Sequence, residues 1–393
     1  MNIGIIGLGK LGLSMLAAFV HRGFNVKGYD VNRLLLEDLQ QGIIRSNEPD
    51  IKEIAQVDNT WTNRFSNNFQ DVFDHADTIF IIVPTPSQND HSFSLEFVTD
   101  AINQINQCFY NNKSIKNIVV SSTVNPGDCD KLRTLLDSKL KLFYSPEFIA
   151  IGSVVQDLLH PDLCIIGADS DSTEVQEIYQ KFYKSTPQYS VLSFKEAEVA
   201  KIAINSYVTI KISFANTIGS LLYNLTNGDS NKIKRTLEAI GSDSRINNKY
   251  FKFGPGFGGP CFPRDNKCLN YHLINQGIHT SLPSASDEFN EWLLEFFTDK
   301  LKHMSCKNLV VVGLSYKPNC DLLEESFVLD LVNKVKGFYT NLYFIDKNIQ
   351  SHPDMQKILD NTNLDKSDTL FLVNYAESSS VFSDYCFYKL WAD

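Results

Sequence analysis

Short apolar runs alternate with amphipathic stretches over the first half of the chain. The apolar runs lie at residues 3–6, 26–30, 78–83, 117–121, 140–144 and 163–166. Runs of this length, each followed by a helical pattern, indicate strands that alternate with helices, which is typical of a parallel, doubly wound sheet. The pattern predicts such a sheet up to about residue 195.

The pattern becomes helical in the middle of the chain and returns to strands near its end. A long helix is predicted from Lys195 to about Asn224 and another from Ser230 to Ile240. Apolar runs recur at 308–313, 342–346 and 369–373. The fold class predicted is therefore α/β, with two doubly wound, Rossmann-like parallel-sheet domains joined by a central helical segment. We expect domains at 1–195, 196–300 and 301–393.

The turn after the first apolar run carries a dinucleotide-binding pattern, G-x-G-x-x-G, and the second predicted strand ends in a carboxylate, Asp30. In this pattern the first glycine permits a tight turn, the second lets the backbone meet a pyrophosphate, and the third lets helix and strand pack closely. The carboxylate accepts hydrogen bonds from the adenosine ribose, which favours NAD over NADP. Arg33 leaves NADP open, because an arginine there can hold a 2′-phosphate. The expected cofactor contacts are Gly7, Gly9, Lys10, Leu11, Gly12, Asp30 and Arg33.

A glycine-rich run in the second half delivers one cysteine to the start of a predicted helix. The run GPGFGGPCFPRD places Cys261 two residues before Pro263, which suits the first turn of a helix. A helix N-terminus and the nearby Arg264 both favour a thiolate, so we predict a lowered pKa and a nucleophilic role for Cys261. A small buried cysteine after a glycine-rich turn is the alternative.

Composition and charge narrow the classes of function. The chain has 393 residues, 43% of them hydrophobic, and a net charge of −10. This charge argues against general binding to nucleic acid or anionic membranes. No apolar run approaches the roughly 20 residues of a membrane helix. Met1 leads directly into the first strand, so we expect a cytoplasmic protein. The eight cysteines have no metal-binding spacing, which predicts reduced thiols and no metal site.

The cysteine run, the amino-terminal fingerprint and a second sheet without G-x-G-x-x-G together resemble the UDP-glucose/GDP-mannose dehydrogenase family over nearly the whole chain. Members oxidise the C6 alcohol of a nucleotide sugar to a carboxylate with two NAD and one water. The resemblance implies catalytic roles for Cys261, Lys201, Asn205, Asp265, Glu147 and Thr123. It implies NAD contacts from Pro84, Thr85 and Thr123. The implied substrate contacts are Glu147, Phe148, Lys201, Asn205, Arg245, Tyr250, Lys252, Gly258 and Lys317, with Arg245 lent to the partner subunit of a homodimer.

Three positions depart from the pattern of that family. Ile151 stands where many relatives have a second glutamate, Glu324 replaces an arginine associated with NAD, and Arg264 replaces a lysine. The reading favoured by the resemblance is oxidation of UDP-glucose to UDP-glucuronate through a thiohemiacetal and a thioester on Cys261. A UDP-N-acetylhexosamine or GDP-mannose substrate, a two-electron dehydrogenase, and a non-catalytic nucleotide-sugar or NAD-binding homologue stay open.

Overall fold

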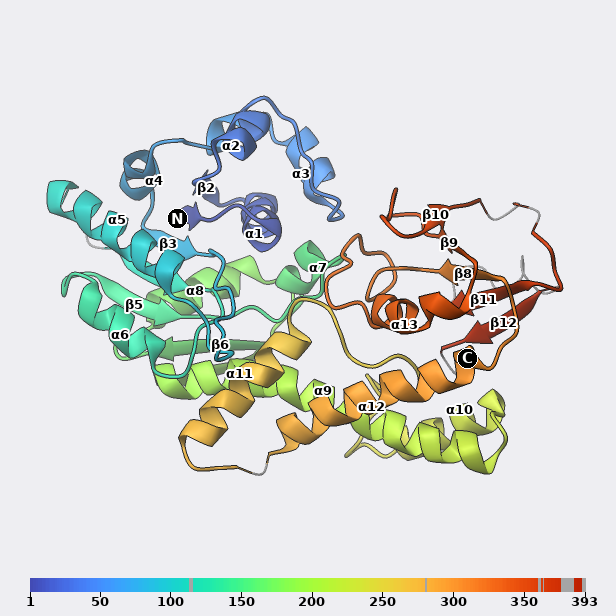
Figure 1. Ribbon diagram of the computed structural model, residues 1–393. Coiled ribbons are helices and arrows are strands. Elements are labelled where there is room, and N and C mark those ends of the chain that lie inside the picture. The colour runs from blue at the N-terminus through green and yellow to red at the C-terminus, as the bar shows by residue number, and fades with distance from the viewer. Residues whose placement is uncertain (113–115, 280, 360–361, 363, 376–384, 391–393) are drawn as a thin grey trace. The chain divides into compact units, whose positions relative to one another are not determined.

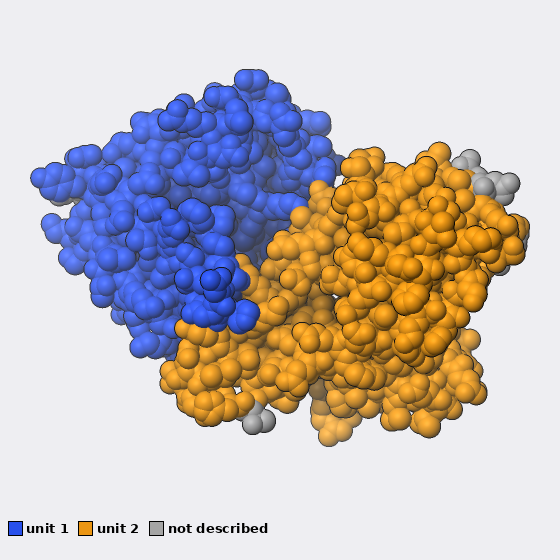
Figure 2. Space-filling model, viewed as in Figure 1, with its two compact units in different colours: residues 1–202 blue, residues 203–393 orange. Residues whose placement is uncertain are grey.

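The computed structural model describes residues 1–112, 116–279, 281–359, 362, 364–375 and 385–390. The chain divides into two compact units, residues 1–202 and 203–393, which Figure 2 shows in different colours. The boundary falls within one long helix. Within the described ranges, no helix is both long and apolar enough to cross a membrane.

The first unit is built on a seven-stranded sheet in the order β2-β1-β3-β4-β5-β6-β7. The strands are β1 (Asn2–Ile6), β2 (Asn25–Tyr29), β3 (Thr78–Ile81), β4 (Asn117–Val120), β5 (Lys141–Tyr144), β6 (Leu163–Ala168) and β7 (Gln188–Leu192). The first six match the predicted apolar runs. β7 lacks such a run because it is a half-exposed edge strand. The predicted parallel arrangement is wrong at β6, which runs antiparallel to β5, because an apolar run carries no strand direction.

Helices cover the first sheet (Figure 1). They are α1 (Lys10–His21), α2 (Arg33–Gln40), α3 (Ile51–Val57), α4 (Phe69–His75), α5 (Glu96–Asn112), α6 (Asp128–Leu135), α7 (Val154–Leu159) and α8 (Thr173–Phe182), with the short 3₁₀ helix η1 (Trp61–Arg64). α1 is buried from Gly12 to Phe19 because it packs against α3 and α7 as well as the sheet. The ring centroid of Phe19 lies 4.1 Å from that of Phe182 on α8.

The middle of the chain is helical, as predicted. α9 (Phe194–Leu225) runs for 32 residues and is followed by α10 (Ser230–Gly241), α11 (Phe262–Asn275) and α12 (Leu282–Lys302). Phe253 packs directly against the backbone of α9 at Gly219. A residue with a side chain would not fit there, because a Cβ at Gly219 would come within 2.3 Å of the Phe253 ring. This close approach fixes the start of the glycine-rich run against α9.

The second unit contains a five-stranded sheet in the order β10-β9-β8-β11-β12, with every neighbouring pair parallel. Its strands are β8 (Asn308–Val312), β9 (Asn341–Ile345), β10 (Gln356–Lys357), β11 (Thr369–Val373) and β12 (Cys386–Lys389). α13 (Phe327–Val335) and the 3₁₀ helix η2 (Lys336–Phe338) follow β8. The predicted fold class, two Rossmann-like sheets linked by long helices, is confirmed.

Each sheet has a point at which the strand order reverses. In the first sheet the chain passes outward from β1 to β2 and then returns to the other side of β1 as β3. In the second sheet the equivalent reversal lies between β8 and β11. Ligands of open α/β sheets bind at such points, beyond the carboxyl ends of the strands. A ligand of the first sheet is therefore expected beside the residues that follow β1 and β3, and a ligand of the second beside those that follow β8 and β11.

Candidate active site

The turn between β1 and α1 needs glycine at two positions and leaves the third open. Gly7 has a φ of +94°, and a Cβ there would approach the Ile82 carbonyl oxygen to 2.2 Å. A Cβ on Gly12 would approach the Gly7 carbonyl oxygen to 1.9 Å. A Cβ on Gly9 would meet no atom of the described residues within 4 Å. This open space at the start of α1, the end of a helix that favours anions, fits the pyrophosphate of a dinucleotide.

Asp30 is held at the end of β2 by the same turn. Its Oδ2 accepts a hydrogen bond from Leu8 N at 2.7 Å, and its Oδ1 accepts one from Asn32 N at 2.8 Å. A carboxylate has about four acceptor positions, so Asp30 keeps capacity for the two hydroxyls of a ribose. Arg33 begins α2 and is exposed, and so is Lys10 at the start of α1.

The loops after β3 and β4 are bonded to each other. Thr85 Oγ1 donates to the Thr123 carbonyl oxygen at 2.7 Å, and Val83 N donates to Ser122 Oγ at 2.9 Å. Pro84 is exposed while Thr85 is buried. The structure therefore brings the predicted cofactor residues Thr85 and Thr123 together at the carboxyl ends of neighbouring strands.

Glu147 and Phe148, which follow β5, gather around Lys201 of α9. Lys201 Nζ donates to the Glu147 carbonyl oxygen at 2.8 Å and lies 4.6 Å from the centroid of the Phe148 ring. The Glu147 side-chain Oε1 is buried and has no hydrogen-bond partner among the described residues. Burial raises the pKa of the Glu147 carboxyl to about 7, although the positive charge of Lys201 opposes the shift. A carboxyl with this pKa can exchange a proton near neutral pH.

Cys261 caps the N-terminus of α11, as predicted, and is exposed. Asp265 N donates to the Cys261 carbonyl oxygen at 2.9 Å, which forms the first turn of the helix. The Asp265 carboxylate is buried; its Oδ2 accepts from Asn205 Nδ2 at 2.6 Å, and its Oδ1 lies 3.5 Å from Arg264 Nε. One helical turn before Asn205, α9 carries Lys201. The second unit thus joins Cys261, Asp265 and Asn205 in one cluster.

The glycine-rich run packs against the segment that links β8 to α13. Gly259 has a φ of +78° and donates from its N–H to the Glu325 carbonyl oxygen at 3.1 Å. A Cβ on Gly258 would approach that oxygen to 2.1 Å. Lys317 lies in this segment, with its Nζ 5.8 Å from the Tyr316 ring centroid. Glu324, the position that departs from the family pattern, is exposed.

Three predicted substrate residues are exposed side chains. Arg245 pairs with Asp243 at 2.7 Å, and Lys252 points to solvent. Tyr250 packs its ring 6.0 Å from that of Phe262, which follows Cys261. Tyr250 therefore lies near the cluster of Cys261, Asp265 and Asn205, whereas Arg245 forms an ion pair with its sequence neighbour Asp243.

Sequence reasoning missed two buried glutamates, Glu48 and Glu198. Both oxygens of Glu48 accept from Gly152 N, at 2.8 and 2.9 Å, which fixes the loop after Phe148. Glu198 on α9 accepts two backbone bonds from the loop after β4. The bonded residues are 104 and about 70 positions apart, so no local pattern could reveal them. A charged residue within an apolar helical face was the available signal for Glu198.

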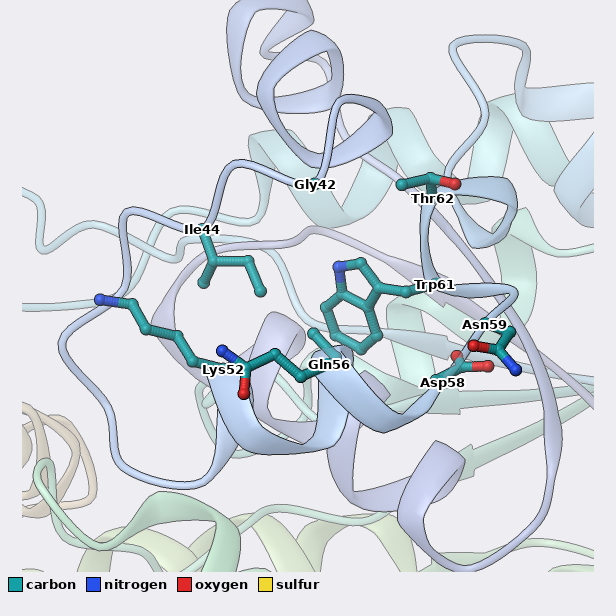
Figure 3. Close-up of a pocket in the computed structure, with 9 residues that line it drawn as sticks. Gly42, Ile44, Lys52, Gln56, Asp58, Asn59, Trp61 and Thr62 are labelled. Carbon is teal, nitrogen blue, oxygen red and sulfur yellow. The ribbon is translucent and has the colours of Figure 1, made fainter.

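A separate pocket of about 350 Å³ lies beside α3 and η1 (Figure 3). Its lining includes Lys52, Gln56, Asp58 and the buried Trp61. No predicted site residue lines it. The pocket therefore belongs to the packing of α3 and η1 against the end of α2 and not to the clusters described above.

Comparison with known proteins defines the class. Residues 1–186 match the NAD-binding domain, and residues 195–292 the central domain, of the UDP-glucose/GDP-mannose dehydrogenase family. The chain belongs to this family, whose members are NAD-dependent nucleotide-sugar dehydrogenases.

Individual relatives to which the chain is similar include UDP-glucose 6-dehydrogenases. UDP-glucose 6-dehydrogenase of Rickettsia felis is 30% identical over 343 residues, which cover 84% of this chain and 75% of the relative. YwqF, a UDP-glucose 6-dehydrogenase of Bacillus subtilis, is 28% identical over 378 residues, 90% of this chain and 81% of the relative. The structure of a UDP-glucose dehydrogenase from Pyrobaculum islandicum matches with a TM-score of 0.82 and 26% identity over 95% of this chain and 90% of that one.

Proposed function

We propose that this chain oxidises the C6 alcohol of UDP-glucose to the carboxylate of UDP-glucuronate. The observation that carries the proposal is the exposed Cys261 at the start of α11, next to the buried Asp265 carboxylate and the half-buried Asn205 amide that donates to it. The named relatives support UDP-glucose as the sugar nucleotide. NAD, when bound, would supply the hydride acceptor for each oxidation, and the open turn at Gly9 with the spare acceptor capacity of Asp30 would hold one dinucleotide at a time.

The residues of the two clusters suit a covalent route. After the first oxidation, the Cys261 thiolate adds to the aldehyde carbon and forms a thiohemiacetal. The second oxidation removes the hydride from that carbon and leaves a thioester, which water cleaves to the carboxylate and the free thiolate. Lys201 and Asn205 are suited to stabilise the oxyanion formed when the thiolate or the water adds. Asp265 holds the Asn205 amide in place through the 2.6 Å bond.

Glu147 is our candidate for moving the proton of the hydrolytic water. Its raised pKa, about 7, makes the ionised form a stronger base than an exposed glutamate. Because only the ionised form can accept a proton, thioester hydrolysis should rise with pH through about 7. Glu147→Gln should remove this dependence and let the thioester accumulate on Cys261. Intact-protein mass spectrometry of enzyme trapped during turnover measures the adduct.

The test of the whole proposal is stoichiometry. Wild-type protein with UDP-glucose should form two NADH per uronate and release no aldehyde, since the thiol retains the intermediate. Cys261→Ser should lose nearly all turnover, because a serine hydroxyl is not ionised at neutral pH. Cys386→Ser, at another exposed cysteine, is the matched control and should keep full activity. One NADH per product would instead support the two-electron dehydrogenase.

Ile151, which replaces the second glutamate of many relatives, supports an alternative substrate. The relatives that lack the second glutamate make UDP-N-acetylhexosamines the runner-up, and GDP-mannose follows. Equal amounts of each nucleotide sugar, assayed for NADH formation, rank these substrates. Activity with none of them, together with measurable NAD binding, would favour the non-catalytic homologue.

We further propose that the enzyme is a cytoplasmic homodimer with domains at 1–195, 196–300 and 301–393. The family models break between 186 and 195, near the first boundary. Four of the exposed apolar side chains of α9 are spaced by seven, seven and four residues, which places them on one helical face. They are Tyr207, Phe214, Leu221 and Leu225. A second copy would cover this stripe and bring its Arg245 within reach of a neighbouring site. Sedimentation of wild type and Phe214→Glu tests the dimer.

A further inference from the structure

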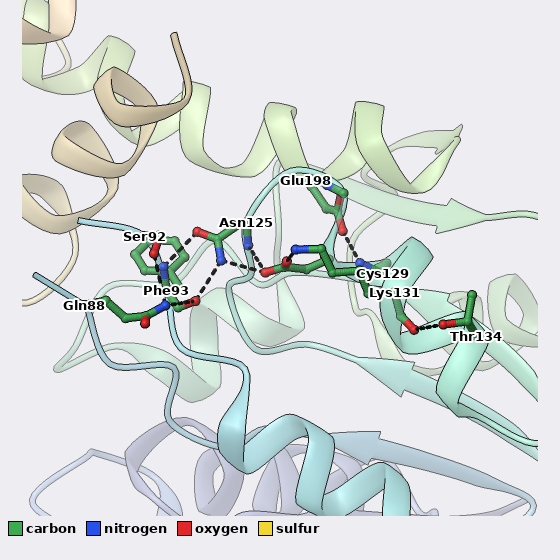
Figure 4. A network of polar contacts seen from close by, with 10 residues as sticks. Gln88, Ser92, Phe93, Asn125, Cys129, Lys131, Thr134 and Glu198 are labelled. Atoms are coloured by element: carbon green, nitrogen blue, oxygen red, sulfur yellow. Dashed lines mark hydrogen bonds and ion pairs between the residues drawn. The ribbon is translucent and has the colours of Figure 1, made fainter. Parts of the chain in front are cut away.

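Glu198 is a fully buried carboxylate on the second turn of α9. Its Oε2 accepts from Gly127 N at 2.5 Å. Its Oε1 accepts from Cys129 N at 2.6 Å, as Figure 4 shows. Burial raises the pKa of Glu198, and the two backbone donors act against that rise. Both oxygens are therefore committed to the turn that leads from β4 into α6.

The loop held by Glu198 is in turn joined to the loop after β3. The side-chain amide of Asn125 pairs with the backbone of Phe93 as a neighbouring strand would. Its Oδ1 accepts from Phe93 N at 2.8 Å, and its Nδ2 donates to the Phe93 carbonyl oxygen at 2.8 Å (Figure 4). Asn125 Nδ2 also donates to Asp128 Oδ2 at 2.6 Å. Together with the Thr85–Thr123 bond, these contacts link the two loops at both ends.

The same helix reaches the loop after β5 one turn later. Lys201 stands three residues after Glu198 and donates to the Glu147 carbonyl oxygen. Glu198 and Lys201 thus attach the loops after β4 and β5 to α9, and Asn125 extends the attachment to the loop after β3. All of these residues lie within the first unit, residues 1–202.

We propose that Glu198 is a positioning residue that sets the distance of Thr85 and Thr123 from Lys201, and so couples cofactor binding to the catalytic helix. The proposal rests on the cofactor and catalytic roles given above to those three residues. Two backbone N–H groups converge on the side chain, one on each oxygen, so both terminal atoms of the side chain must be acceptors. The carboxylate is therefore required, whereas a merely space-filling role would be satisfied by any side chain of equal shape.

Glu198→Gln tests this directly, because the amide keeps the shape but turns an N–H₂ toward one backbone donor. At a temperature well below the melting point of the variant, we expect its dissociation constant for NAD to rise on the order of tenfold, since small misplacements of positioning groups have large effects. The value of kcat should fall by about the same factor while KM for UDP-glucose changes less than about twofold. Glu177→Gln, at an exposed glutamate of α8, is the control and should change neither value.

A double-mutant cycle with Asn125→Ala tests the link from the other end of the loop. If the loop acts as one unit, the losses of NAD affinity in Glu198→Gln and Asn125→Ala should be strongly non-additive. Additive losses would overturn the coupling. A folded Glu198→Gln with a lower melting point but unchanged NAD affinity and kcat would show a structural role only. If Glu198→Gln does not fold, Asn125→Ala alone must lower NAD affinity for the proposal to stand.

The two proposals fail separately. Calorimetric titration with NAD needs no sugar nucleotide, so it tests Glu198 even if UDP-glucose is not the substrate. Conversely, wild type that binds NAD but does not oxidise UDP-glucose would overturn the proposed substrate. The NAD titrations of the Glu198 variant would still test the positioning role.

Discussion

The first and second sheets contain the same hydrogen-bonded turn. Gly7, after β1, has a φ of +94° and donates to the Tyr29 carbonyl oxygen at 2.9 Å. Gly313, after β8, has a φ of +84° and donates to the Ile345 carbonyl oxygen at 2.9 Å. In both sheets the next backbone N–H binds an aspartate at the end of the neighbouring strand. The bond from Leu314 N to Asp346 is 2.9 Å long.

The two aspartates differ in the number of hydrogen-bond acceptor positions that remain for a ligand. Asp30 accepts two backbone bonds and is only half-buried. Asp346 is buried and accepts four bonds. The donors are Leu314 N, Asn348 N, Ile349 N and the Tyr375 hydroxyl. Since a carboxylate has about four acceptor positions, Asp346 is saturated while Asp30 can still bind a ligand.

The reversal points differ in the same way. Next to the first turn, Gly9 faces open space. In the second sheet, Asn374 Nδ2 donates to the Ser315 carbonyl oxygen at 2.9 Å, and a Cβ on Gly313 would lie 2.4 Å from the Tyr375 ring. The comparison shows that one local geometry can serve binding or stability, depending on whether neighbouring side chains occupy it. That the second sheet meets a nucleotide through different phosphate contacts stays a prediction, and the filled turn supports it.

The largest expected effect is the loss of stability when each aspartate is replaced by alanine. Asp346→Ala leaves three backbone N–H groups near a buried site without an acceptor, so we expect the free energy of unfolding to fall by about 3–5 kcal/mol. Asp30→Ala should cost less, about 1–2 kcal/mol, because it leaves two donors and one of them, Asn32 N, is exposed to water. Urea denaturation followed by circular dichroism measures both. Equal losses would mean that saturation of Asp346 does not distinguish the sheets.

Sequence alone predicted the first sheet better than the second for a physical reason. The G-x-G-x-x-G pattern is local, so Gly7, Gly12 and Asp30 could be assigned from spacing. The saturation of Asp346 depends on Tyr375, which is 29 positions away in sequence and lies in the segment after another strand, β11. Contacts between side chains that are distant in sequence produce no periodic pattern in it, so they could not be predicted.

The candidate site shows the same limit. Helical spacing placed Lys201 and Asn205 on one face, and Pro263 marked the start of the helix after Cys261. The partners of those side chains, Glu147 and Asp265, were assigned only through resemblance to a family. Glu198 had neither a motif nor a local partner, so the sequence marked it at most as a charge within an apolar helical face, and its two bonds appear only in the folded chain.

The next effect compares the two turns by adding one methyl group. Gly313→Ala should lower the free energy of unfolding by about 2–3 kcal/mol, because its φ is positive and Tyr375 blocks the Cβ. Gly9→Ala should change stability by less than about 0.5 kcal/mol but weaken NAD binding on the order of tenfold, because the methyl takes space that a pyrophosphate needs. Thermal unfolding and NAD titration of both variants decide. Unchanged NAD affinity in Gly9→Ala would place the cofactor elsewhere.

Cofactor choice should depend on Asp30 and not on Asp346. The Asp30 carboxylate repels a 2′-phosphate, so wild type should prefer NAD over NADP by tens to hundreds of fold in kcat/KM, roughly 2 kcal/mol. Asp30→Asn should reduce this preference on the order of tenfold. Asp346→Asn is the matched control and should leave the ratio as it is in whatever fraction stays folded. An unchanged ratio in Asp30→Asn would assign the choice to Arg33.

The smallest expected effect concerns the fourth bond to Asp346. Tyr375→Phe keeps the ring over Gly313 and removes only the hydroxyl that donates to Asp346 Oδ2 at 3.2 Å. A bond to a charged group contributes about 1.5 kcal/mol at this length, so the free energy of unfolding should fall by that amount while NAD affinity stays constant. Tyr339→Phe removes a buried hydroxyl that donates to the Leu301 carbonyl oxygen at 3.0 Å, and this neutral bond should contribute about 1 kcal/mol. If Tyr375→Phe costs less than Tyr339→Phe, the carboxylate gains little from its fourth donor. Asp346 would then keep an acceptor position for a ligand, and the contrast between the two sheets would rest on the packing of the Tyr375 ring alone.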